Sequence, residues 1–395
     1  MARMCMVVVA WLAIVPTLTT FADAADDSAV QVAIPRQGPF AIDGGGPKLT
    51  IGGHFQARYQ STFGLESDQP EDTVTGFYLP RMRLSFDADL PDDRFSFTVV
   101  TDFNRSTGEA TALDVYGEAQ LNDSTKLRFG QYKLPFTREF DVSSKRVVAV
   151  DRSVADGFFR INRTQAVTLD YRGDRVRVRL SSSDGRQASN TTFFDSDEAD
   201  YAFTGRFELR LGDAGWRQYR DMSSFRGSEN GVLLGAAVHF QRDGDTRQPS
   251  SLFGDEEVSL LSFTADASFE GDGWNIGTFF YGQTFDGNDN TITDLAFTVQ
   301  GGLFVTETFE VFARWSQAFP DDDRITNDTF SQVSTGFTRF IIPKSHALKF
   351  TFEVAYSPGD QAQSSSLIGR RDFNGIFPDQ DNDQFAILAQ LQMLF

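Results

Sequence analysis

The sequence predicts an all-β protein, a transmembrane antiparallel β-barrel of about 16 strands. Three observations indicate this fold: alternation of apolar and polar residues, alternation of short and long connections, and an N-terminal export signal. The clearest alternation lies in the last segment, where every second residue from Phe385 to Phe395 is apolar. Because successive strand residues point to opposite faces, one face of this segment suits lipid and the other a wet interior.

The N-terminal region has the features of a signal peptide. Arg3 precedes an apolar run over 6–15, which is too short to span a bilayer. Ala22-Asp23-Ala24 then has the small-x-small pattern of a cleavage site, so we predict a signal peptide over 1–24, cleaved after Ala24. The cysteine at position 5 lies inside this signal, which leaves the mature chain no thiol for disulfides, metals or catalysis.

Two regions are predicted after the signal. Residues 25–47 are rich in Pro and Gly without a period, which indicates a short periplasmic lead segment. Residues 48–395 form the barrel domain. The mature chain of about 370 residues, at about 22 per strand and connection, gives about 16 strands in one domain. The predicted strands are 48–61, 76–90, 94–104, 111–121, 125–134, 164–172, 174–182, 201–211, 231–242, 257–269, 274–285, 293–305, 308–318, 329–342, 346–357 and 384–395.

The connections support a membrane barrel over a soluble β-sandwich, the main alternative for evenly spaced strands. Short and long connections alternate, as expected for periplasmic turns and outer loops. The connection 212–230 departs from this rule, because it should be a periplasmic turn and yet is long. Either the turn is elaborated or a pair of strands lies there.

A charged and aromatic segment carries a family resemblance. Residues 130–140 read Gly-Gln-Tyr-Lys-Leu-Pro-Phe-Thr-Arg-Glu-Phe, and Asp151-Arg152-Ser153 follows. Together with Arg81-Met82-Arg83-Leu84, this pattern resembles the phosphate-selective porin O/P family over roughly 48–180. The resemblance implies a sixteen-stranded barrel in the bacterial outer membrane, usually a homotrimer, with a loop folded into the pore.

Basic residues alternate with apolar ones on several predicted strands. Val176, Val178 and Leu180 suit lipid, which turns the arginines between them inward, because lipid-facing arginine costs about 2–4 kcal/mol near the midplane. Inward guanidinium groups select anions and suit phosphate or carboxylate. The predicted pore-lining anion pathway is Arg81, Arg83, Lys126, Arg128, Arg175, Arg177, Arg179, Arg206 and Arg210. In the alternative, these residues only neutralise carboxylates of the wall, such as Asp102, Glu118 and Glu208.

The connection over 134–163 is the third outer loop by position. Its apolar residues predict a packed plug folded into the barrel, and the alternative is an outward-facing lid. The basic residues expected at this constriction are Lys133, Arg138, Lys145, Arg146 and Arg152.

Other functions find little support in the sequence. The three histidines lie on separate strands, and no His-x-x-x-His, Gly-x-Ser-x-Gly or phosphate-binding loop occurs, so we predict neither an enzyme nor a cofactor or metal site. No basic-aromatic patch predicts nucleic-acid binding. Net charge is −19, with acids gathered in segments such as 379–383, so the alternative function is a structural or surface-interaction barrel whose acidic loops bind a partner or cations.

The expected function is passive diffusion of small anions, with phosphate as the candidate solute. The expected partners are outer-membrane lipid and the barrel assembly machinery, which would read Phe395 in the terminal strand.

Overall fold

The barrel forms one unit, Gly38–Phe395, and the other unit is Met1–Gln37. In the computed structural model, the described residues are 40–42, 48–64, 73–90, 94–104, 106–193, 195–246, 250–254, 256–324, 329–358, 375 and 383–395. The predicted signal peptide and cleavage after Ala24 lie outside these residues. No helix among the described residues is long and apolar enough to cross a membrane.

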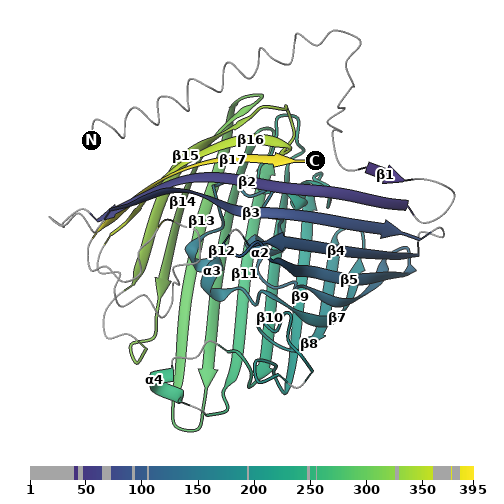
Figure 1. The fold of residues 1–395 in the computed structure, drawn as a ribbon, viewed down its shortest axis with the longest axis vertical. Helices are drawn as coiled ribbons and strands as arrows, with labels where there is room; N and C mark the ends of the chain where they lie inside the picture. Colours follow the sequence, from purple (N-terminus) through teal and green to yellow (C-terminus); the bar gives the residue numbers. More distant parts are fainter. Residues whose placement is uncertain are drawn as a thin grey trace. The chain divides into compact units, whose positions relative to one another are not determined.

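Sixteen antiparallel strands close into a barrel (Figure 1). They are β2 (Lys48–Gly64), β3 (Thr73–Asp89), β4 (Phe95–Phe103), β5 (Ala110–Asn122), β6 (Thr125–Lys133), β7 (Arg163–Arg172), β8 (Val176–Ser183), β9 (Tyr201–Gly212), β10 (Gly231–Arg242), β11 (Ser259–Gly271), β12 (Trp274–Asp286), β13 (Thr291–Thr306), β14 (Phe309–Phe319), β15 (Phe330–Phe340), β16 (Leu348–Ser357) and β17 (Gln384–Leu394). Each strand pairs with its neighbour in sequence, and β17 closes the ring by pairing with β2. The predicted fold class and all sixteen strands are confirmed, within a few residues at their ends.

Alternation places the apolar side chains outside. On β8, Leu180 is 55% exposed whereas Arg179 is 5% exposed, and on β4 the rings of Phe95 and Phe97 are about half exposed. An outward apolar face and a polar, filled interior are the pattern of a barrel in lipid.

The end of the chain joins the first barrel strand. Phe395 and Gly53 exchange two backbone hydrogen bonds, with N···O distances of 2.9 and 3.3 Å. The Phe395 ring lies against Gly53, where a Cβ atom would come within 2.1 Å of it. Glycine therefore allows the ring to pack over the seam between β17 and β2.

One expected irregular segment contains an additional strand. Within 25–47, the short strand β1 (Phe40–Ile42) pairs antiparallel with Leu49–Ile51 of β2. Backbone pairing with β2 places these three residues in a strand, which the Pro- and Gly-rich composition of 25–47 did not predict.

The connection 212–230 is an elaborated turn, and no pair of strands was missed there. It contains the 3-10 helix η2 (Gln218–Arg220) and buries Ala214, Tyr219, Met222 and Ser224. Its backbone reaches the third loop, because Met222 N donates to Arg146 O at 3.0 Å. This turn therefore enters the lumen from the end opposite to the long loops.

Candidate functional site

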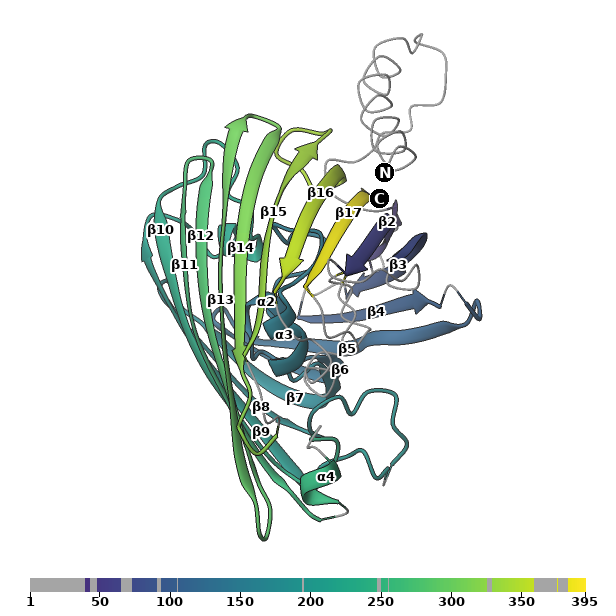
Figure 2. The ribbon, with the colours of Figure 1, turned by 90° about the vertical axis from the view of Figure 1, so that its left-hand side faces the viewer.

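The loop between β6 and β7 folds into the barrel, as the sequence predicted (Figure 2). It carries two short helices, α2 (Arg138–Asp141) and α3 (Val154–Phe159). Thr137 and Ser153 cap them by accepting hydrogen bonds from Phe140 N and Asp156 N. Almost all of the loop is buried, so it is a packed plug and not an outward-facing lid.

Apolar packing holds one side of the loop against the wall. Val142, Val148 and Phe159 share a buried cluster with Tyr281 of β12 and Phe312 of β14. The Phe159 and Tyr281 rings stack with centroids 5.7 Å apart. These apolar contacts stabilise the inserted position of the loop, because burying the side chains removes apolar area from the wet interior.

The motif glycine at the base of the loop has a geometric role. Gly130 adopts a φ of +120°, and a Cβ atom there would lie 2.3 Å from Val115 O. Only glycine accepts this conformation without strain, which accounts for the first residue of the Gly-x-Tyr-Lys segment.

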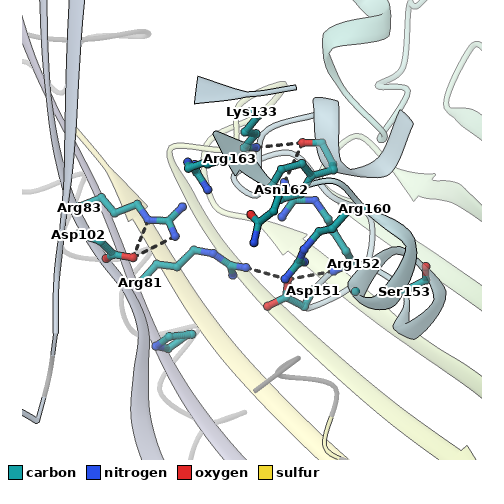
Figure 3. A pocket seen from close by; sticks show the side chains of 13 residues that line it. Arg81, Arg83, Asp102, Lys133, Asp151, Arg152, Ser153, Arg160, Asn162 and Arg163 are labelled. Carbon is teal, nitrogen blue, oxygen red and sulfur yellow. Dashed lines mark hydrogen bonds and ion pairs between the residues drawn. The ribbon is translucent and has the colours of Figure 1, made fainter. Parts of the chain in front are cut away.

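The polar side of the loop borders a cavity of about 150 Å³ (Figure 3). Lining side chains come from β3, β4, β6, β7 and the loop. Six of them are cationic, namely Arg81, Arg83, Lys133, Arg152, Arg160 and Arg163, and two are anionic, Asp102 and Asp151. We call this cavity the loop chamber.

Asp151 connects the loop to the wall. It pairs with Arg81 at 2.8 Å and with Arg58 at 3.1 Å, and all three side chains are buried. Burial raises the pKa of this carboxyl, but the charges of Arg81 and Arg58 outweigh burial and hold the pKa of Asp151 well below its usual range. Asp151 is therefore a fixed negative charge at the chamber wall.

The pKa of a second buried carboxyl in the loop, that of Asp156, shifts in the opposite direction. Asp156 accepts a hydrogen bond from Thr137 Oγ1 at 2.5 Å, and its other oxygen has no hydrogen-bond partner. Burial, reinforced by the charge of Glu139, raises the pKa of Asp156 to about 6. The charges of Arg152 and Arg160, whose nitrogens lie 4.0 and 3.9 Å away, oppose this increase without cancelling it.

Most of the predicted anion pathway faces the lumen, but it is largely neutralised. Arg83 pairs with Asp102, and Lys126 and Arg128 share Glu118. The remaining pairs are Arg177 with Asp170, Arg179 with Asp141 and Glu208, and Arg206 with Glu208 and Asp266. These ion pairs are those expected in the alternative of a neutralised wall, and the anion selectivity of the pathway stays a prediction.

Two predicted pathway residues lie at strand ends. Arg175 is exposed in the turn before β8, and so does not continue the row of Arg177 and Arg179. The tight connection from β7 takes it out of the strand. Arg210, near the end of β9, donates to the backbone oxygens of Asp174 and Ala214.

The predicted constriction residues divide among three cavities. Lys133 and Arg152 line the loop chamber, and Lys145 lines a smaller adjoining cavity. Arg138 and Arg146 line a cavity of about 300 Å³ at the short-turn ends of the strands, which we call the turn chamber. Phe140 borders the loop chamber and Asp141 the turn chamber, so α2 lies between the two.

Sequence reasoning did not single out several lumen residues. Arg58 and Arg314 are buried, and Arg314 pairs with Glu353 at 2.9 Å. The alternation of apolar and polar residues along their strands could have placed both arginines on the lumen face. Arg220 lies in a turn, where no periodic pattern could have assigned it to the lumen.

Comparisons with known proteins agree with this architecture. Residues 50–220 match the family model of phosphate-selective porins O and P. An anion-selective porin from Comamonas acidovorans has a similar fold, with a TM-score of 0.61 at 11% identity over 88% of this chain and 100% of that chain. The outer-membrane channel DcaP of Acinetobacter baumannii gives a TM-score of 0.60 at 14% identity over 90% and 100%.

A third similar structure is the trimer form of OmpT from Vibrio cholerae, with a TM-score of 0.54 at 13% identity over 89% of this chain and 100% of that chain. No curated protein sequence matches the chain. The family match confirms the resemblance found in the sequence.

Proposed function

We propose, from the match of residues 50–220 to the phosphate-selective porin O and P family, that this chain is a bacterial outer-membrane porin for passive diffusion of small anions. The observation that carries the proposal is the loop chamber, where six cationic side chains face two carboxylates beside an inward loop. Cationic groups at a constriction favour anions. The fold and the family match support a channel, and we propose that it converts no substrate chemically.

Lys133 gives the chamber a hydrogen-bond donor that no carboxylate of the described residues occupies. Its ammonium group donates to Phe140 O at 3.0 Å and has no carboxylate partner within the described part of the chain. Arg83 and Arg163, which are paired with Asp102 and Asp114, add directional donors beside it. A small anion exchanging between such donors is held weakly enough to move on. Phosphate is our candidate solute.

The assembly partners are part of the same proposal. We infer a homotrimer, supported by the trimeric OmpT of similar fold. The exposed apolar face would contact outer-membrane lipid. The barrel assembly machinery would read the terminal strand and Phe395.

The test is the reversal potential of the purified protein in a planar bilayer under a KCl gradient. We expect a potential of the sign set by chloride, larger at low ionic strength because salt screens the lumen charges. A potential set by potassium would overturn the anion assignment. A protein that inserts but conducts no ions would favour the alternative of a structural or surface-interaction barrel.

A further inference from the structure

The turn chamber differs from the loop chamber in size and in its uncompensated charge. It occupies about 300 Å³, twice the volume of the loop chamber. Its lining comes from the short-turn ends of β6, β7, β8, β9 and β10, from α2 and the residues after it, and from the inserted turn 213–230.

Three arginines of this chamber have no ion pair within the described residues. They are Arg146 of the loop, Arg172 at the end of β7 and Arg220 of η2. The other cations of the lining are satisfied: Lys126, Arg128 and Arg177 by carboxylates, and Arg138 by the backbone oxygens of Tyr219 and Asp221. The three unpaired groups therefore leave net positive charge here.

The three unpaired arginines carry like charges, which repel when no anion lies between them. Arg172 faces Arg177 in the register of β7 and β8, and like charges in that position destabilise a sheet. Arg220 is only partly buried; this burial lowers its pKa, and the charges of Arg172, Arg146, Arg177 and Arg217 lower it further. An anion placed among the three would relieve this repulsion.

Arg220 is in position because the inserted turn is anchored on both sides. Asp221 accepts from His346 Nε2 at 2.8 Å, and Ser223 donates to Glu310 at 2.8 Å. Tyr219 packs in a buried cluster with Ala214 and Leu233. The turn is thus a built part of the lumen and not a loose connection.

The chamber also has an apolar side. Val142, Trp216, Tyr219 and Leu233 line it together with the arginines. Inorganic phosphate has no carbon surface to place against these side chains, whereas a short hydrocarbon chain gains free energy by leaving water. Guanidinium groups in turn match the planar carboxylate geometry.

We propose that the turn chamber is a binding site for small organic dianions, with two carboxylates held by Arg146, Arg172 and Arg220 and the carbon skeleton against Trp216 and Leu233. This inference rests on the proposed anion channel and specifies its solute class. The inserted turn is required, since it supplies both Arg220 and Trp216.

The test measures block of the chloride current by a second anion in a planar bilayer. The probes are succinate, monomethyl succinate and inorganic phosphate. We expect succinate to block at lower concentration than either of the others. Arg172→Gln and Arg220→Gln should each weaken succinate block by about tenfold, the effect of losing one charged contact. Arg220→Lys should keep part of the block.

The matched control is Arg175→Gln, which removes the same charge from an exposed position in the turn before β8, outside the chamber lining. It should leave succinate block close to wild type, and heat-modifiable migration on gels should confirm that every variant is folded. Unchanged block in both Arg172→Gln and Arg220→Gln would overturn the site. Equal block by phosphate or by monomethyl succinate would overturn the organic dianion. An anion-selective wild type that succinate does not block refutes this inference alone, whereas a cation-selective wild type refutes the proposed function as well.

Discussion

Single carboxylates decide how firmly the loop is held. Asp151 serves two arginines of the wall, and its removal would leave Arg58 and Arg81 buried without that charge. Breaking a buried ion pair from one side usually costs more than the pair contributes, because an uncompensated charge remains.

We therefore expect Asp151→Asn to destabilise the loop by about 3–5 kcal/mol and to strengthen anion preference. Faster amide exchange over 134–162 and a larger reversal potential would be the two readouts. Asp289→Asn, in an exposed connection, is the control for charge alone. Wild-type exchange in Asp151→Asn would contradict the anchoring role.

Asp156 gives the loop a dependence on pH. Its pKa rises from 3.8 to about 6 on folding, so the folded loop binds the proton more tightly than the unfolded loop does. The resulting stabilisation is fully present below pH 3.8 and is lost as pH rises through 6, and it amounts to about 3 kcal/mol.

Amide exchange of α3 should accordingly be slower at pH 4 than at pH 7 after correction for intrinsic rates. Asp156→Asn stays neutral throughout and should remove most of this difference. If the variant and the wild type show the same pH dependence, another group is responsible.

At the scale of elements, β8 shows how strand ends limit a row of charges. Arg177 and Arg179 face the lumen and are paired, while Arg175 lies outside the strand. Changing both lumen arginines to Gln would expose the carboxylates of Asp170 and Glu208, which now face guanidinium groups.

The double variant Arg177→Gln/Arg179→Gln should therefore shift the reversal potential toward cations, most clearly at low ionic strength. Arg175→Gln removes the same charge from the exposed turn and should have little effect. Equal shifts in both proteins would mean that position relative to the lumen does not matter.

At the scale of the whole molecule, closure depends on the seam between β17 and β2. Phe395 is 47% exposed on the apolar outer face, and its backbone pairs with Gly53. An acidic side chain at this place would meet lipid, which is unfavourable.

We expect Phe395→Asp to lower the fraction of protein that acquires heat-modifiable migration in the outer membrane, with synthesis and export unchanged. Phe193→Asp, in an exposed connection, introduces the same change away from the seam and should insert normally. Normal insertion of Phe395→Asp would remove Phe395 from the assembly signal.

The sequence alone determined the barrel, its sixteen strands and the inserted loop. These features are local: alternation along β17 or β8 records which face meets lipid, and the apolar residues around Phe159 cannot remain in a water-filled loop. The orientation of Arg177 and Arg179 followed from the same alternation.

Only the tertiary structure decided which charges are compensated. Arg58 and Asp151 are 93 residues apart in the chain, and nothing in the alternation of β2 specifies that partner. The position of Arg220 depends on contacts of its turn with His346 and Glu310, which a turn sequence does not encode. Alternation gives the face of a strand residue, but the field in the lumen depends on long-range pairing between strands and inserted segments, and that pairing exists only after the barrel has closed.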